Sequence, residues 1–302
     1  IFVKNMVRIL YYIIIVLLKM VSLLPLKVHY LFSDIFAFFI GKVFKYRYST
    51  IMINLARSFP ELHYRQLDKI ASDFYKFLSD TIAESIWLYS ASRKKVGEMV
   101  KIEGKEILED ALSKGKNVAV MLGHIGNWEL FTALPDLKGF YGMDIENKSF
   151  TYVYKKPTSK LAHLVINNIR EKHQACSIIE SKNVIRHILK DKEKKSIFFF
   201  ICDQCPTARE SDFKVNFLNQ TTYMLEGPEY ISAKTSMPVV YCGVVRKGRR
   251  DNTAVLKLIC EDASTMEKGV ITSTFAKYLE EDITNNPHTW LWSHRRWKHN
   301  TK

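Results

Sequence analysis

The sequence predicts an α/β fold with a central sheet flanked by helices, and three observations support that prediction. Short apolar segments, such as residues 117–122 and 196–201, recur along the chain. Segments with helical periodicity separate them, as at residues 101–116 and 184–195. The apolar segments also lack polar alternation, which is typical of a sheet that is buried on both faces.

Composition limits the class of protein and the kind of partner. The 302 residues are 47% hydrophobic and 25% charged, which excludes a disordered or fibrous chain. The 45 basic and 31 acidic side chains leave a formal charge of +14, which favours an acidic partner such as an anionic membrane surface, an acidic protein or a nucleic acid. No nucleic-acid-binding module is present, so nucleic acid is not expected to be the partner. Five irregularly spaced cysteines fit reduced thiols.

The N-terminal segment is the most apolar part of the chain. Residues 9–18 are uninterrupted by any polar or charged side chain except tyrosine hydroxyls, Lys19 follows, and a second apolar patch covers residues 31–44. One interpretation is a membrane anchor followed by an interfacial helix, and the other is two buried core helices. We favour the first, with membrane-associated helices at residues 1–45 and the α/β domain at residues 46–302.

The remaining elements follow in order. Residues 50–100 have a helical pattern. Strands are predicted at residues 117–122, 150–154, 176–180, 196–201, 238–245 and 254–260. Helices are predicted at residues 101–116, 128–137, 161–173, 184–195, 226–236 and 273–286.

The segment VAVMLGHIGNWE at residues 118–129 is the best candidate for a site. A buried strand ends at Leu122, Gly123 makes a turn, and His124 follows, and ligand sites of α/β sheets lie beyond the carboxyl ends of strands. Glu129 meets His124 only if His124 lies in the turn and Glu129 in the first turns of the next helix. Such a carboxylate would make His124 a general base, whereas the alternative is a capping histidine and a surface glutamate.

Five segments in order resemble the lipid A late acyltransferases, the lauroyl and myristoyl transferases of Gram-negative envelopes. They are GHIGNWE at 123–129, VYK at 153–155, Asp203–Gln204, FLNQTT with Glu226–Gly227, and the closing PHTWLWSHRRWK at 287–298. The family often has proline directly after the basic residue of its tyrosine segment, whereas this chain has Lys155, Lys156 and then Pro157. Either lysine is a candidate for that basic position.

The resemblance implies roles for these residues. His124 would deprotonate an acceptor hydroxyl that attacks an acyl thioester, and Glu129 would orient His124. Arg170 and Lys155 are candidates for the oxyanion or for acceptor phosphates, and Asp203 would hold one of these cations or bind the acceptor. The remaining residues expected to bind substrate are Asn127, Gln204, Arg295 and Arg296.

The resemblance also implies a glycerolipid-acyltransferase-like fold, acyl carrier protein as donor and a lipid A precursor as acceptor. The catalytic domain would lie on the cytoplasmic face of the inner membrane, with no cofactor and no metal. Two alternatives remain. One is an acyltransferase for another glycolipid or an amino-acid-linked lipid, with acyl-CoA or acyl carrier protein as donor, and the other is a non-catalytic lipid-binding homologue.

Two further patterns are assigned structural roles. Cys202 and Cys205 have the spacing of half a zinc or redox site, but no second cysteine pair completes it, so buried thiols are expected. The basic run at residues 246–250 lies between two predicted strands, and we interpret it as a solvated hairpin tip.

Overall fold

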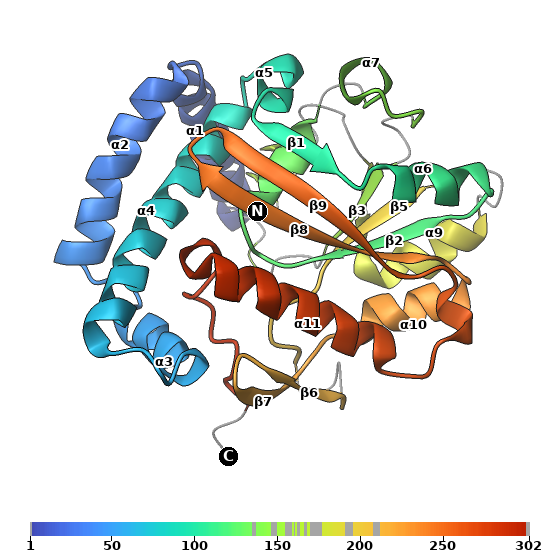
Figure 1. Ribbon diagram of the computed structural model, residues 1–302. Coiled ribbons are helices and arrows are strands. Elements are labelled where there is room, and N and C mark those ends of the chain that lie inside the picture. The colour runs from blue at the N-terminus through green and yellow to red at the C-terminus, as the bar shows by residue number, and fades with distance from the viewer. Residues whose placement is uncertain are drawn as a thin grey trace.

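The computed structural model has one seven-stranded sheet with helices on both faces (Figure 1). It describes residues 2–134, 137–145, 150–154, 159, 161, 164–165, 168–169, 177–190, 196–207 and 212–299. The sheet strands are β1 (Val100–Glu103), β2 (Val118–Leu122), β3 (Phe150–Tyr154), β4 (Ser177–Glu180), β5 (Ile197–Ile201), β8 (Val239–Gly248) and β9 (Asp251–Cys260). A separate hairpin joins β6 (Lys214–Phe217) to β7 (Gln220–Tyr223).

The order across the sheet is β1-β9-β8-β2-β5-β3-β4. β2, β3, β4, β5 and β8 run parallel to one another, and only the β8–β9 hairpin introduces an antiparallel pair. β2 lies in the middle, with Leu122 opposite Ile201 of β5 and Cys242 of β8. The turn after β2 therefore lies between the carboxyl end of β5 and the neighbouring part of β8.

Helices cover both faces of the sheet, and alternate residues of each strand pack into separate cores. Ala119 and Met121 face one core, while Val118, Val120 and Leu122 face the other. In Figure 1, α11 and α10 lie on one side of the sheet and α6 on the other. The described α-helices that follow β1 in the chain are α6 (Glu106–Ser113), α7 (Leu137–Tyr141), α9 (Val184–Lys190), α10 (Gly227–Lys234) and α11 (Val270–Asn285).

The N-terminal third is helical and packs beside the sheet (Figure 1). Its elements are α1 (Phe2–Ser22), α2 (Leu26–Phe38), the π-helical turn η1 (Phe39–Val43), α3 (Tyr48–Ser58), α4 (Tyr64–Leu88) and α5 (Arg93–Gly97). α2 packs along α4, which is buried along much of its length. α4 thereby lies between α2 and most of the sheet, while α2 also reaches the turn of the β8–β9 hairpin, where Asp34 pairs with Arg249.

α1 and α2 are bent by 114° at the break between them. Pro25 is incompatible with a continuing helix, and it stands at the N-cap of α2. Among the described residues, neither helix alone has the length and hydropathy of a membrane span, whereas the bent pair passes that test together. The second interpretation, two buried core helices, does not fit the exposure of their apolar side chains, such as Ile9 at 61% and Leu31 at 60%.

The predicted α/β class with a helix-flanked sheet is confirmed, and all six predicted strands form. Two local predictions were wrong. Residues 100–103 form β1 rather than part of a helix, because Gly104 adopts a φ of +77° and separates the strand from α6. The segment after His124 forms only the short 3-10 helix η2 (Trp128–Ala133), because Leu134 precedes a proline and is extended.

Candidate active site

The candidate site lies in the turn after β2. Leu122 ends the strand, Gly123 follows, and His124 is the next residue. A Cβ at Gly123 would lie 2.7 Å from Leu279 Cδ1 of α11 and 3.4 Å from Asp203 Oδ2, so only glycine fits here without displacing a neighbour. The close packing brings His124 against Asp203, two residues after the end of β5.

His124 and Asp203 form the central contact of the site. His124 Nδ1 lies 2.6 Å from Asp203 Oδ1, and Oδ2 of the same carboxylate accepts a hydrogen bond of 2.9 Å from the His124 backbone N–H. A carboxylate only accepts, so the neutral imidazole carries its proton on Nδ1 and keeps a lone pair on Nε2. The His124 side chain is 17% exposed, which leaves part of it open to substrate.

Asp203 is buried at 2% exposure and is held by a third donor, the indole N–H of Trp290, at 2.8 Å from Oδ2. Burial by itself raises the pKa of this carboxyl. The charge of His124 and the hydrogen bonds from His124 and Trp290 outweigh burial and hold the pKa of Asp203 at about 2. Asp203 is therefore ionised throughout the physiological pH range and stabilises an imidazolium at His124.

The carboxylate on His124 differs from the expected one. Asp203 contacts Nδ1 of the imidazole, whereas the sequence predicts that Glu129 orients His124. His124 lies in the turn and Glu129 in the first turn of η2, as predicted, and the Glu129 backbone N–H donates to Asn127 Oδ1 at 3.2 Å. Asp203 was noticed as part of an Asp-Gln pair after an apolar strand, but its contact with His124 depends on β5 lying beside β2, which local pattern does not reveal.

Two other side chains frame the free face of the imidazole. The amide nitrogen of Gln204 lies 3.3 Å from His124 Nε2, where it donates to the lone pair. The ring of Trp128 meets the imidazole edge-on, with 4.8 Å between ring centroids. Gln204 was expected to bind substrate, and its position beside Nε2 fits a group that contacts the reacting atoms.

The closing segment of the chain holds the His124 loop. The Leu291 N–H donates to the His124 carbonyl at 3.1 Å, the Gly126 N–H donates to the Thr289 carbonyl at 3.0 Å, and Ile125 forms a β-bridge with Trp290. The tryptophans of this segment are core residues, since Trp290 and Trp292 are almost completely buried. The closing sequence is thus a structural support of the turn that carries His124.

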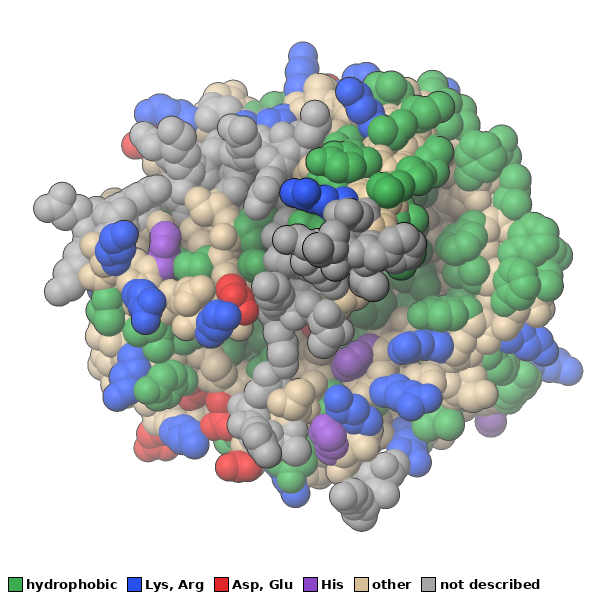
Figure 2. All heavy atoms as spheres, turned by 180° about the vertical axis from the view of Figure 1, so that it is seen from behind, with side chains coloured by type: hydrophobic (Ala, Val, Ile, Leu, Met, Phe, Trp, Pro, Cys, Tyr) green, Lys and Arg blue, Asp and Glu red, His purple; other side chains and the backbone are tan. Residues whose placement is uncertain are grey.

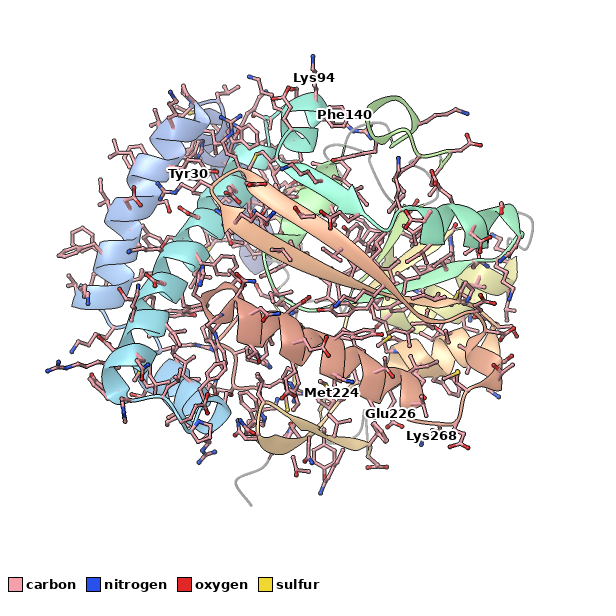
Figure 3. All side chains as sticks on the ribbon, viewed as in Figure 1. Tyr30, Lys94, Phe140, Met224, Glu226 and Lys268 are labelled. Atoms are coloured by element: carbon pink, nitrogen blue, oxygen red, sulfur yellow. The ribbon has the colours of Figure 1, made fainter. Side chains whose placement is uncertain are left out.

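Asn127 is completely buried and contacts protein groups rather than an open cleft. Its amide donates to Glu84 Oε2 at 2.6 Å, and Glu84, on α4, is also completely buried. Arg246 of β8 binds both oxygens of Glu84, at 2.9 and 2.8 Å, and Tyr30 of α2 donates to Oε1 at 2.8 Å; Figure 3 shows Tyr30 on α2 near α4. Asn127 was expected to bind substrate; in the structure its buried amide joins the His124 loop to this ionic network.

The hairpin tip at residues 246–250 forms as predicted, but it is only partly solvated. Arg246 is buried against Glu84 and Asp80. Arg249 is ion-paired with Asp80 of α4, at 2.8 Å, and with Asp34 of α2. These pairs lie at the junction of α2, α4 and the hairpin, so two of the four basic residues in this run are neutralised by acids far away in the chain.

Arg295 and Arg296 have different environments. Arg295 is exposed, whereas Arg296 is completely buried, and its guanidinium donates to Thr222 Oγ1 at 2.9 Å and to the Tyr223 carbonyl at 2.7 Å. Burial lowers the pKa of Arg296 to about 10, so it stays charged at neutral pH. Arg296 was expected to bind substrate; in the structure its buried guanidinium joins the closing segment to β7. Lys155 and Arg170, also expected at the site, lie outside the described residues.

An apolar cavity of about 320 Å³ opens next to Gln204. Its walls come from the ends of β3 and β5 and from α10, and its polar groups are few. The side chains that line it include Val153, Phe200, Ile201, Leu225 and Ile231. A cavity of this character fits a hydrocarbon chain whose polar end is at His124.

Neither cysteine of the pair at 202 and 205 forms a disulfide, and burial raises the pKa of the Cys202 thiol well above its usual value. In the described part of the chain, no group of three or more histidine, cysteine or acidic side chains is arranged to hold a metal ion. The chemistry available here therefore centres on a partly exposed histidine, a buried carboxylate and an amide.

Comparison with known proteins gives the family. A family model described as bacterial lipid A biosynthesis acyltransferase matches residues 3–299, which is nearly the whole chain. No curated protein matches the chain. The matched region contains every element of the site, from α1 and α4 to the closing segment that supports His124. The chain therefore belongs to the bacterial lipid A biosynthesis acyltransferase family, and it is an acyltransferase.

Proposed function

We propose that the protein transfers a fatty acyl chain from the thioester of acyl carrier protein to a hydroxyl group of a lipid A precursor, with His124 as general base. The observation that carries this proposal is the 2.6 Å contact of His124 Nδ1 with the buried, ionised Asp203, which keeps the proton on Nδ1 and the lone pair on Nε2, where a base accepts a proton. The family match supports lipid A as the acceptor class.

The reaction needs no covalent enzyme intermediate. The acceptor hydroxyl would replace the Gln204 amide at His124 Nε2, lose its proton to Nε2 and attack the thioester carbonyl. The tetrahedral oxyanion would be stabilised by hydrogen-bond donors, for which the Gln204 amide is placed 3.3 Å from Nε2. Collapse would break the carbon–sulfur bond, and the imidazolium would return its proton to the leaving thiolate.

The cavity beside Gln204 would hold the acyl chain. It lies at the carboxyl end of β3 and β5, where it continues from the proposed position of the thioester carbonyl. An acyl chain buried there leaves the carbonyl at His124 and excludes water from the competing hydrolysis.

α1 and α2 would attach the enzyme to the cytoplasmic face of the inner membrane. Their exposed apolar side chains form a continuous hydrophobic area, seen at the upper right of Figure 2. The most exposed members are Ile9, Tyr12, Met20, Leu23, Leu31 and Phe44. A surface of this kind on one side of a protein is typical of membrane contact.

The donor is tested by comparing acyl carrier protein with acyl-CoA at a matched acyl chain and at two ionic strengths. Acyl carrier protein is acidic and this chain carries a formal charge of +14, so added salt should weaken their association and lower kcat/KM. Preference for acyl-CoA with little salt dependence would contradict the carrier-protein donor. Mass spectrometry of the product, with other glycolipids and amino-acid-linked lipids as competing acceptors, tests the acceptor.

A further inference from the structure

A pocket of about 500 Å³ lies at the bend between α1 and α2, away from His124. Three segments meet there: the bend itself, the end of α4 with the start of α5, and the tip of the β8–β9 hairpin. Ser22 of the bend is bound to Ser90, which follows α4, through their hydroxyl oxygens at 2.6 Å. The pocket is therefore built by contacts between segments that are distant in the sequence.

Three cations line this pocket, one from each segment: Lys27, Lys95 and Arg250. None of the three is in an ion pair with a carboxylate of the described residues, in contrast to the neighbouring Arg249, which is paired with Asp80 and Asp34. The lining contains one acid, Glu98, so its formal charge is 3 − 1 = +2. An uncompensated positive pocket of this kind favours an anionic ligand.

The rim of the pocket is apolar. Leu23 and Leu24 line it at the bend and are 68% and 37% exposed. They continue the exposed apolar surface of α1 and α2, so the pocket places cations directly beside the surface that would contact lipid. A free anion in this pocket would contact only the three cations, whereas an anionic lipid would also contact Leu23 and Leu24 with its apolar part.

The position of the pocket separates it from the acceptor site. Cys242 of β8 is level with Leu122 at the end of β2, and β8 continues for six more residues to Gly248 at the hairpin tip. At about 3.3 Å per residue, the tip extends roughly 20 Å beyond β2. A headgroup held by Arg250 would thus lie well outside the reacting centre, on the same edge of the sheet.

We propose that this pocket binds the phosphodiester headgroup of an anionic bilayer glycerophospholipid, with Leu23 and Leu24 against its acyl chains. The inference rests on the proposed membrane contact of α1 and α2. A bound lipid would fix the rotation of the enzyme on the membrane and keep the carboxyl edge of the sheet, with His124, at the level of the lipid headgroups.

The test measures binding of dihexanoylphosphatidylglycerol, a short-chain anionic phospholipid, to the full chain in non-ionic detergent by titration calorimetry. The variant is Lys27→Ala/Lys95→Ala/Arg250→Ala, and the matched control is Lys94→Ala/Lys190→Ala/Lys277→Ala, which removes the same charge from exposed lysines outside the pocket. Figure 3 shows Lys94 pointing away from the protein. Thermal unfolding of both variants checks that they fold.

We expect saturable binding with a stoichiometry near one, weakened about five-fold per cation and on the order of 100-fold in the triple variant, with the control unchanged. Equal binding of dihexanoylphosphatidylcholine, equal binding of inorganic phosphate, or an equal loss in the control variant would each overturn the proposal. If the triple variant does not fold, single substitutions at the same three positions provide the same comparison.

Acyl transfer by the unaltered protein is measured in parallel in micelles. Phospholipid binding without acyl transfer would contradict the proposed function and leave the headgroup site intact. Acyl transfer without phospholipid binding would contradict the headgroup site alone.

Discussion

Replacement of Asp203 by asparagine tests which carboxylate supports the catalytic histidine. Asp203 accepts from the imidazole, from the His124 backbone and from Trp290, and its pKa is about 2 rather than the ordinary 3.8. This difference corresponds to about 2 kcal/mol in favour of the ionised form inside the protein. Asp203→Asn removes that charge and offers an N–H to Nδ1, which favours the tautomer with its proton on Nε2 and so removes the base.

We expect Asp203→Asn to lower kcat by roughly 10²- to 10⁴-fold, the range for losing a general base or its correct tautomer. The assay is acyl transfer under saturating donor and acceptor, with mass-spectrometric detection of the product. Glu129→Gln is the matched control, because it makes the same chemical change in the carboxylate that follows His124 by five residues. A folded Asp203→Asn protein with near-normal kcat, together with a large loss in Glu129→Gln, would refute the assignment of Asp203 and restore Glu129.

Three other outcomes are expected. His124→Ala should lower kcat by about 10²- to 10⁴-fold in a protein that still folds, and near-normal turnover of the folded variant would remove the mechanism. Gly126→Ala should lower the free energy of unfolding by about 2–4 kcal/mol, because Gly126 has a φ of +60° and a Cβ there would lie 2.7 Å from Val244 Cβ. The control is Gly248→Ala, which should be nearly neutral because a Cβ at Gly248 would have nothing within 4 Å. Urea unfolding measures both variants. The ionised Asp203 contributes stability that is fully present above the unfolded-state pKa near 4 and is lost as the pH falls toward 2. In urea unfolding, Asp203→Asn should therefore lose about 2 kcal/mol less stability on acidification than the unaltered protein. An equal dependence of stability on pH in the two proteins would contradict the lowered pKa of Asp203.

Six strands of the sheet were predictable because each is a short, mostly apolar segment, whereas β1, with the sequence VKIE, carries two charged residues and was predicted as part of a helix. The position of His124 followed from the same pattern, since a histidine directly after such a strand lies at the carboxyl edge of the sheet. The partner of His124 was not predictable in this way. β3 follows β2 among the core strands, but β5 lies between them in the sheet, and this strand order brings Asp203 to the imidazole.

The partners of the charged and amide side chains were likewise not predictable from local sequence. Arg246 belongs to a run that looks solvated because its neighbours in the sequence are basic, yet it is buried against Glu84, 162 residues away. Arg296 and Asn127 look like substrate ligands because they lie in polar motifs, and both are buried among protein groups. Local sequence shows that a side chain carries a charge or an amide, whereas its partner depends on packing across the whole chain.

The support of the His124 loop by residues 289–291 has a consequence for synthesis of the protein. A ribosome makes the sheet strands and His124 well before Trp290, and Trp290 supplies one of the three donors to Asp203. A nascent or truncated chain that stops before Trp290 therefore contains the histidine and the carboxylate without the contacts that hold them in register. Premature termination would remove three buried tryptophans of the core together with the support of the His124 loop, so we expect the capacity for acyl transfer to arise only after translation of the closing segment.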